Sequence, residues 1–363
     1  MKIDANLSAA LTNSKGDVKT YAISYFSSIS RATVEEELKK IGAAIVPTKF
    51  VGSNIVFIQP DKKLIDAIAA IPFVSNIRLQ SITDKVLNNH STQLHALSSL
   101  FAPAGRHLSG RSITVGVGDN SEVSTHIDFT GRLINRVYAV PSYHGLHTSG
   151  TVSGGGLRNP IYTGLAPKST LVSQWFSDVV TNTSTYVTDY NIVATNNSYT
   201  TADDACPGEG VYDATSNYLD NLMRNYGSVL HVFAAGNDGG YTCNPAAPGY
   251  STVKSGWQTA KNTLTVGALN QANYIITGFS SKGPVQDGRI KPEIVASGYN
   301  TWSTVNLNLY GPNSGTSMAA PVVTGAAAIM NERYKQLHGT TAKASLIKAL
   351  MCNTAEDLGS AGP

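Results

Sequence analysis

Ser317 stands in the segment 315–321, Gly-Thr-Ser-Met-Ala-Ala-Pro, where small residues surround one hydroxyl. A long apolar run follows, and Pro321, which has no amide hydrogen, suits the first turn of a helix. The pattern predicts that Ser317 lies at the N-terminus of a buried helix, where free N–H groups and the helix dipole would stabilise a developing oxyanion. A serine at this place can equally be a simple helix cap, and the stretch alone does not decide between the two.

The stretch around Ser317 is similar to the nucleophile motif of the subtilisin-like serine proteases, and three further motifs match that family in its order. The segment 115–119 resembles the strand that ends in the triad aspartate, and the segment 144–151 resembles the triad-histidine motif. The segment 233–239 resembles the loop that carries the oxyanion asparagine. The resemblance covers residues 81–363 and is weaker before them. It implies a serine endopeptidase of the subtilisin-like (subtilase) family.

The resemblance also implies a role for each site residue. Ser317 is the expected nucleophile, His144 its general base and Asp119 the group that orients the histidine. Asn237 is the expected donor to the oxyanion. By spacing alone His147, one helical turn after His144, could be the base instead, and only the family register favours His144. The chain order Asp, His, Ser is the subtilisin order, unlike those of chymotrypsin-like enzymes and α/β-hydrolases.

The elements that must position these residues are predicted to form an α/β fold, and the resemblance implies the three-layer subtilisin-like fold with a mostly parallel central sheet. Strands are predicted at 112–118, 170–175, 192–199 and 229–235. Asp119 follows the first of these strands, at the end where sites form in open α/β sheets. In the family, the end of the third strand is the edge that pairs with substrate main chain, so Asn197, Ser198 and Tyr199 are the candidate substrate-binding residues.

The region before the catalytic motifs reads as a separate small domain. Residues 1–18 are polar and small and are expected to be a flexible lead-in. Residues 19–83 follow the order β-α-β-β-α-β of a ferredoxin-like α+β unit, in which a capping box at 33–36 is expected to open the first helix. Such a unit resembles the family's inhibitory, folding-assisting pro-domain. Residues 84–363 would then be the catalytic domain of a zymogen, truncated at its C-terminal end by comparison with the family.

Composition excludes several classes of function. Only 14% of the 363 residues are charged and the net charge is +3, too little to indicate nucleic-acid binding. No apolar run reaches the ~18–20 residues of a membrane span, and the first residues lack the apolar core of a signal peptide. The resemblance implies that the partners are peptide or protein substrates and the chain's own pro-domain. A secreted or extracytoplasmic location is expected, with the signal peptide absent from this chain.

Cysteines and loop carboxylates complete the prediction. Cys206 and Cys243 lie in turn-rich loops that flank the expected site, and we predict a disulfide between them, with two free thiols as the alternative. Cys352 is expected to be a buried apolar residue. No cofactor is needed for the chemistry. Calcium is common in relatives, so a structural calcium site stays open, without assigned ligands. Asp128 is interpreted as a solvated loop charge.

Two rival functions remain at this point. One is a non-peptide acyl hydrolase on an α/β fold, against which the triad order argues. The other is a latent or catalytically silent binding protein with the subtilase fold. All four expected site residues are present, which makes a pro-domain-inhibited zymogen the simpler form of a silent protein.

Overall fold

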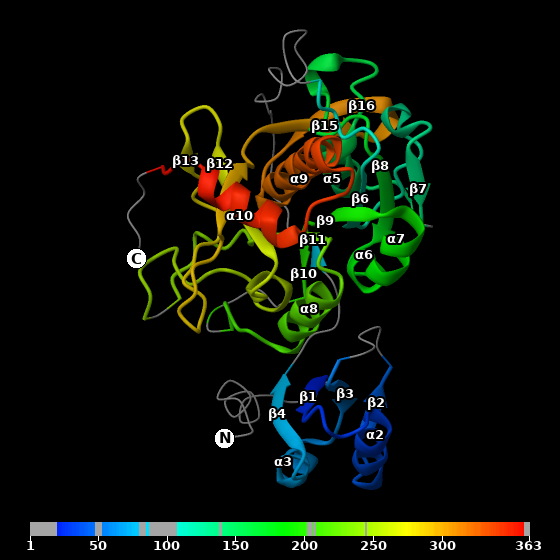
Figure 1. The fold of residues 1–363 in the computed structure, drawn as a ribbon. Coiled ribbons are helices and arrows are strands. Elements are labelled where there is room, and N and C mark those ends of the chain that lie inside the picture. The colour runs from blue at the N-terminus through cyan, green and yellow to red at the C-terminus, as the bar shows by residue number, and fades with distance from the viewer. Residues whose placement is uncertain are drawn as a thin grey trace.

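The computed structural model describes residues 20–47, 53–79, 85–86, 107–137, 140–201, 206, 208–243 and 245–358. The predicted lead-in, residues 1–18, and most of the junction between the two predicted domains lie outside these ranges. The described residues form a small N-terminal sheet unit and a larger α/β unit (Figure 1). In the described part of the chain no helix is long and apolar enough to span a membrane.

The N-terminal unit has the predicted β-α-β-β-α-β order. Its elements are β1 (Tyr21–Tyr25), α2 (Arg31–Lys40), β2 (Ala44–Val46), β3 (Ile55–Gln59), α3 (Ile65–Ala70) and β4 (Val74–Leu79), with a 3-10 turn at Lys62–Leu64. The sheet order is β2-β3-β1-β4, and both β1 pairings are antiparallel. Helix α2 begins two residues before the predicted capping box, because the Ser30 hydroxyl caps it by accepting a hydrogen bond from the Thr33 amide at 3.2 Å.

The two faces of this small sheet have different partners. Side chains alternate along a strand, so Ile23 packs with Leu38 and Ile68 in a core of the unit's own beneath its helices. Phe57, on the other face, belongs to the hydrophobic core of the larger unit, as do Ala22 and Ile55. The Arg78 guanidinium donates to the Tyr212 carbonyl, 2.5 Å away, just before helix α8 (Ala214–Asn225). The second face of the sheet is therefore docked on the larger unit.

The larger unit is built on an eight-stranded sheet of order β13-β12-β11-β9-β6-β8-β7, with β14 also paired to β12. Every pairing is parallel except that of β13 with β12. This agrees with the predicted mostly parallel sheet. The strands are β6 (Thr114–Asp119), β7 (Leu133–Asn135), β8 (Thr170–Trp175), β9 (Ile192–Asn197), β11 (Leu230–Ala234), β12 (Leu264–Asn270), β13 (Ile275–Ile276) and β14 (Ile294–Ser297).

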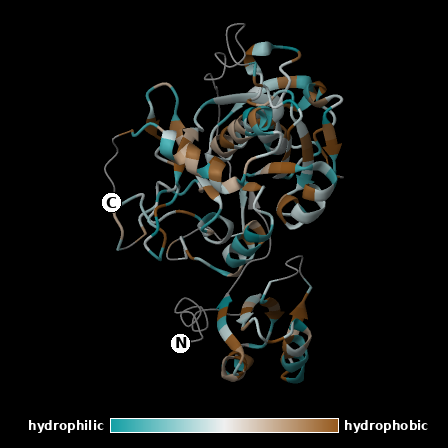
Figure 2. Ribbon diagram, viewed as in Figure 1, coloured by the Kyte–Doolittle hydropathy of each residue, from teal (hydrophilic) through white to brown (hydrophobic). Residues whose placement is uncertain are grey.

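Helices cover both faces of this sheet and complete the three predicted layers (Figure 1). They are α5 (Tyr143–Ser153), α6 (Asp178–Thr181), α7 (Thr183–Tyr190), α8, α9 (Thr316–His338) and α10 (Ala344–Thr354). Helix α9 lies across the central strands, and hydrophobic or neutral residues dominate it and the strands beneath it (Figure 2). Two short ribbons lie outside the main sheet: β15 (Thr301–Val305) with β16 (Leu309–Asn313), and β5 (Lys85–Val86) with β10 (Tyr199–Thr200).

The first strand of the site is held close to a helix by glycines. A Cβ atom on Gly118 would lie 2.2 Å from the Phe176 carbonyl oxygen and 2.6 Å from a methyl group of Val179 in α6. Only glycine allows α6 to approach β6 so closely. The tight contact fixes the end of β6, and therefore the residue that follows Gly118, Asp119.

Candidate active site

Asp119 is the last residue of β6, and its side chain is buried. Its Oδ1 lies 2.8 Å from His144 Nδ1 and 2.8 Å from the Asn120 amide, which donates to it. Its Oδ2 accepts a hydrogen bond from the Thr148 hydroxyl at 2.9 Å. Because both oxygens of the Asp119 carboxylate have partners, the orientation of this buried carboxylate is fixed. A carboxylate at Nδ1 favours the His144 tautomer with hydrogen on Nδ1, in which Nε2 is the nitrogen that can take a proton.

Helix α5 carries both candidate histidines, and the structure separates them. His144 lies beside Asp119 as described. His147, one turn along the helix, has a different partner, with its Nε2 2.9 Å from the Thr301 carbonyl oxygen. Burial lowers the pKa of His147 to about 3, so this imidazole stays neutral at physiological pH. Geometry therefore supports His144 as the base and His147 as a structural residue, a choice that spacing alone left open.

Ser317 is the second residue of α9, so Pro321 lies inside the helix and not in its first turn. The chain enters the helix through Gly315, whose φ of 152° is in the region that favours glycine. Ser317 is completely buried, and its hydroxyl points at the Ser198 carbonyl oxygen at 3.5 Å. The predicted nucleophile is therefore at a helix N-terminus, as expected, and directly beside the predicted substrate-binding edge.

Asn237 follows strand β11 and faces the start of α9. Its Oδ1 accepts hydrogen bonds from the Thr316 amide at 2.9 Å and the Thr316 hydroxyl at 3.1 Å. These contacts identify the amide oxygen, so that Nδ2 points away from Thr316. Nδ2 is buried and has no hydrogen-bond partner among the described residues. A buried N–H without a partner is costly in a resting protein, and it suits a site where negative charge appears only during reaction.

The predicted substrate-binding residues lie at the end of β9, but they do not share one role. The Asn197 side chain turns into the core, where Nδ2 donates to the Val232 carbonyl oxygen at 3.0 Å. The Ser198 hydroxyl donates to the Ser317 carbonyl at 2.9 Å. The Tyr199 side chain is buried, while its backbone pairs with Val86 in the antiparallel ribbon of β10 with β5. The predicted edge is thus the backbone from Tyr199 to Thr200, which β5 occupies in this structure.

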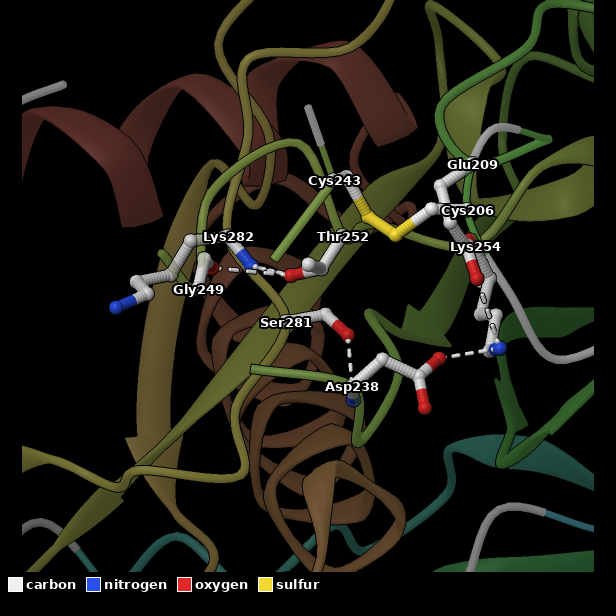
Figure 3. The surroundings of a disulfide bond; sticks show 9 residues. All are labelled: Cys206, Glu209, Asp238, Cys243, Gly249, Thr252, Lys254, Ser281 and Lys282. Carbon is white, nitrogen blue, oxygen red and sulfur yellow. Dashed lines mark hydrogen bonds and ion pairs between the residues drawn. A yellow bond between two sulfur atoms is a disulfide. The ribbon is translucent and has the colours of Figure 1, made fainter. Parts of the chain in front are cut away.

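The structure joins Cys206 and Cys243 in a disulfide that links the two loops that carry them (Figure 3). Cys352 is a free thiol that is partly buried. The interpretation of Asp128 as a solvated charge is wrong, because its carboxylate is buried and accepts hydrogen bonds from the Gly156 amide at 2.8 Å and the Tyr310 hydroxyl at 2.9 Å. Within the described ranges no group of three or more His, Cys, Asp or Glu side chains could hold a metal. A calcium site formed by loop oxygens stays a prediction.

The sequence profile of the subtilase family matches residues 110–363, which include every residue of this site. The chain belongs to the subtilase family. Over 346 residues this subtilase is 25% identical to subtilisin amylosacchariticus of Bacillus subtilis subsp. amylosacchariticus, covering 91% of the chain and 84% of that protein. Over 137 residues it is 36% identical to pyrolysin of Pyrococcus furiosus, covering 32% of the chain and 10% of pyrolysin. The aligned part is thus a small fraction of that relative's length.

Solved structures support the same fold. Fervidolysin from Fervidobacterium pennivorans superposes with a TM-score of 0.63 at 19% identity, covering 93% of this chain and 57% of that one. The coverage of this chain extends well beyond the catalytic motifs. At this identity the likeness establishes the fold alone.

Sequence reasoning missed the residues that hold the site in place. Thr148 fixes Asp119 and Thr316 fixes Asn237, yet neither carries the chemistry. Thr148 lies one turn after His144 on the same helix face, and that spacing is a signal that could have identified it. Lys254 was missed as well, since a lysine in a loop ordinarily reads as a solvated charge.

Proposed function

We propose that this subtilase is a serine endopeptidase that acts through an acyl-enzyme on Ser317 and is made as a zymogen. The observation that carries the proposal is the pairing of His144 Nδ1 with Asp119 Oδ1 at 2.8 Å, both side chains being buried. With its Nδ1 hydrogen directed to Asp119, His144 takes the Ser317 proton on Nε2 as the hydroxyl attacks the scissile carbonyl. It then gives that proton to the leaving amine, and water completes the cycle by the same route.

The negative oxygen of the tetrahedral intermediate would be stabilised by two groups. One is the Asn237 Nδ2, whose orientation Thr316 sets. The other is the backbone amide of Ser317 at the N-terminus of α9, where the helix dipole also favours negative charge. Substrate main chain would pair with β10, which gives affinity with little dependence on side chains. Peptides and proteins in an extended conformation are the substrates that fit this edge.

The N-terminal unit is proposed to inhibit the site. Its sheet is docked on the larger unit through Phe57 and Arg78, and the strand that follows it, β5, occupies the proposed substrate edge of β10. An extended segment of the same chain on that edge competes with substrate at a high effective concentration. The disulfide supports an oxidising environment, and we propose that the protein works outside the cytoplasm.

The register of β5 indicates where the chain would be cut. Lys85 lies opposite Thr200 and Val86 opposite Tyr199, so the strand runs towards Ser198. The Ser317 hydroxyl lies at the Ser198 carbonyl. The proposed self-cleavage should therefore fall within a few residues after Val86.

The test is an intact-mass measurement before and after treatment with a fluorophosphonate probe, with peptide mapping of the adduct. We expect one adduct, on Ser317, together with an N-terminal fragment that ends shortly after Val86. The Ser317→Ala variant should stay full-length and unlabelled. If the chain remained unlabelled after trypsin had removed the N-terminal unit, the endopeptidase proposal would be wrong. Labelling with turnover of esters but not of casein would instead favour a non-peptide acyl hydrolase.

A further inference from the structure

Lys254 is a buried lysine beside the loop that carries Asn237 (Figure 3). Its ammonium forms an ion pair with Glu209 Oε1 at 3.0 Å and a second, shorter ion pair with the Asp238 carboxylate. Asp238 follows Asn237 directly in the chain. A charge is removed from water only at a considerable cost, which two carboxylates at contact distance offset. The arrangement therefore ties a buried cation to the residue adjacent to the proposed oxyanion donor.

The backbone and the aliphatic part of the Lys254 side chain contact the residues that precede Asn237. The Lys254 amide donates to the Ala235 carbonyl at 3.0 Å. A Cβ atom on Gly236 would lie 2.9 Å from Lys254 Cγ, so the lysine stem packs against the backbone of Gly236. Lys254 thus contacts the chain on both sides of Asn237, before it at 235–236 and after it at 238.

Ser281, from a second segment of the chain, also holds the loop of residues 236–238. The Ser281 hydroxyl accepts a hydrogen bond from the Asp238 amide at 3.0 Å, and the Ser281 amide donates to the Gly236 carbonyl at 3.0 Å. The backbone at Gly236 and Asp238 is therefore fixed by Ser281, while the Asp238 side chain is fixed by Lys254. Only 13% of the Asp238 side chain is exposed, so it lies close to solvent and is held inward by the ammonium.

The disulfide reinforces this arrangement through Glu209. Cys243 follows Asp238 in its loop, and Cys206 precedes Glu209 in the other loop, so the bond ties together the two segments that carry the carboxylates. The Glu209 segment is also held to the Lys254 segment, because the Gly210 amide donates to the Val253 carbonyl at 2.7 Å. The two carboxylates and the lysine together carry a formal net charge of −1. Removal of the Lys254 ammonium would leave two carboxylates close together without a compensating charge.

We propose that Lys254 is a positioning residue for the oxyanion amide of Asn237 and acts through Asp238. This inference rests on the proposed function, since it needs a negative oxygen for Asn237 to stabilise. Without the ammonium, the Glu209 and Asp238 carboxylates would repel each other in a poorly hydrated place. Asp238 is the one near solvent and would turn outward, moving the backbone at Asn237. A shift of about 1 Å at a catalytic group can cost ~10²-fold in rate.

The test is a double-mutant cycle of Lys254→Met with Asn237→Ala on the processed enzyme. We expect Lys254→Met to lower kcat at least about 10-fold with little change in KM, because only the transition state carries the oxyanion. In the Asn237→Ala background the same change should lower kcat less than about 2-fold, since no amide remains to be positioned. Lys291→Met is the matched control, because Lys291 is also a buried lysine, paired with Glu293 and away from the oxyanion loop.

Asp238→Asn gives a second route if Lys254→Met does not fold. It weakens the ion pair while keeping the shape of the side chain, and it should lower kcat only where Asn237 is present. Equal losses of kcat in both backgrounds would overturn the positioning role and leave the endopeptidase proposal intact. An unchanged kcat in Asn237→Ala itself would overturn the oxyanion role of Asn237 and, with it, the positioning role of Lys254, because there would be no donor to position.

Discussion

The Ser198 hydroxyl donates a hydrogen bond to the Ser317 backbone carbonyl at 2.9 Å. Inside a helix this carbonyl would accept from the amide four residues later, but that residue is Pro321, which has no N–H. The Ser317 hydroxyl points back at the Ser198 carbonyl at 3.5 Å. Because Pro321 has no N–H, the Ser317 carbonyl can accept from the Ser198 hydroxyl instead. This hydrogen bond fixes the proposed nucleophile relative to the proposed substrate edge.

Removing that link should affect both stability and rate. In Ser198→Ala the buried Ser317 carbonyl loses the hydroxyl that donates to it, which we expect to cost about 1–3 kcal/mol in the free energy of unfolding. Release of the edge should also lower kcat/KM about 10-fold. Denaturant unfolding and peptide hydrolysis measure the two effects. Thr188→Ala, which removes an exposed helix hydroxyl, is the control and should change neither. Wild-type kcat/KM in Ser198→Ala would contradict this role.

Thr316 should determine the orientation of the Asn237 amide. Thr316→Ala removes the hydroxyl that lies 3.1 Å from Asn237 Oδ1 and keeps the backbone donor. We expect kcat to fall about 10-fold, less than the ~10²–10³ expected for loss of the donor itself in Asn237→Ala. Thr316→Ser keeps the hydroxyl and should retain most of the activity. Equal rates in the alanine and serine variants would mean that the backbone amide alone orients Asn237.

The N-terminal unit should dock more weakly without Arg78. Arg78→Ala removes a charged hydrogen bond, 2.5 Å long, to the Tyr212 carbonyl. If a fragment that ends at Val86, and so keeps β5, inhibits the larger unit in trans, its inhibition constant should rise about 10-fold, in line with ~1.5 kcal/mol for a charge-assisted bond. Lys40→Ala removes a lysine that pairs only within α2 and should leave the constant unchanged. An equal inhibition constant for the wild type, Arg78→Ala and Lys40→Ala would mean that Arg78 does not contribute to docking.

His231 should make the enzyme sensitive to acid. Burial lowers its pKa from 6.5 to about 3 in the folded protein. Below pH 6.5 the unfolded chain therefore binds a proton that the folded chain does not, and stability falls as the pH decreases from 6.5 towards 3. Between pH 6.5 and 5 this group alone should remove about 2 kcal/mol. His231→Gln should reduce the pH dependence of the unfolding free energy over that range without abolishing it, because burial lowers the pKa of His147 to about 3 as well. An unchanged slope would show that His231 does not contribute.

The disulfide should stabilise the folded chain chiefly by restricting the unfolded one. It closes a loop with a sequence separation of 37, for which the chain-entropy estimate is about 3–4 kcal/mol. The Cys206→Ala/Cys243→Ala double variant should lose roughly that amount in denaturant unfolding under oxidising conditions. Cys352→Ala, which removes the free thiol, is the control for loss of a cysteine. Equal stability of the double variant and the wild type would mean that strain or residual structure cancels the effect.

The sequence by itself predicted the family and the mostly parallel sheet, which the family profile and the structure confirm, and it supplied the four residues to which chemical roles are proposed. This was so because these features are local. A serine before a helix, an aspartate after an apolar strand and an asparagine after another can each be identified within a few residues. The β-α-β-β-α-β order of the N-terminal unit was accessible for the same reason, since hydrophobic periodicity reports elements one at a time.

Tertiary structure alone decided the contacts between distant segments. His144 was separated from His147 only by the position of Asp119, which lies 25 residues away in the chain. The sequence could not reveal that Lys254 is buried, because the carboxylates that neutralise it come from loops that only folding brings together. The same applies to Asp128, which the sequence indicates to be a solvated charge. Its carboxylate accepts a hydrogen bond from the Tyr310 hydroxyl, 182 residues away in the chain. The stability of a buried charge depends on its partners, and long-range partners are a property of the fold.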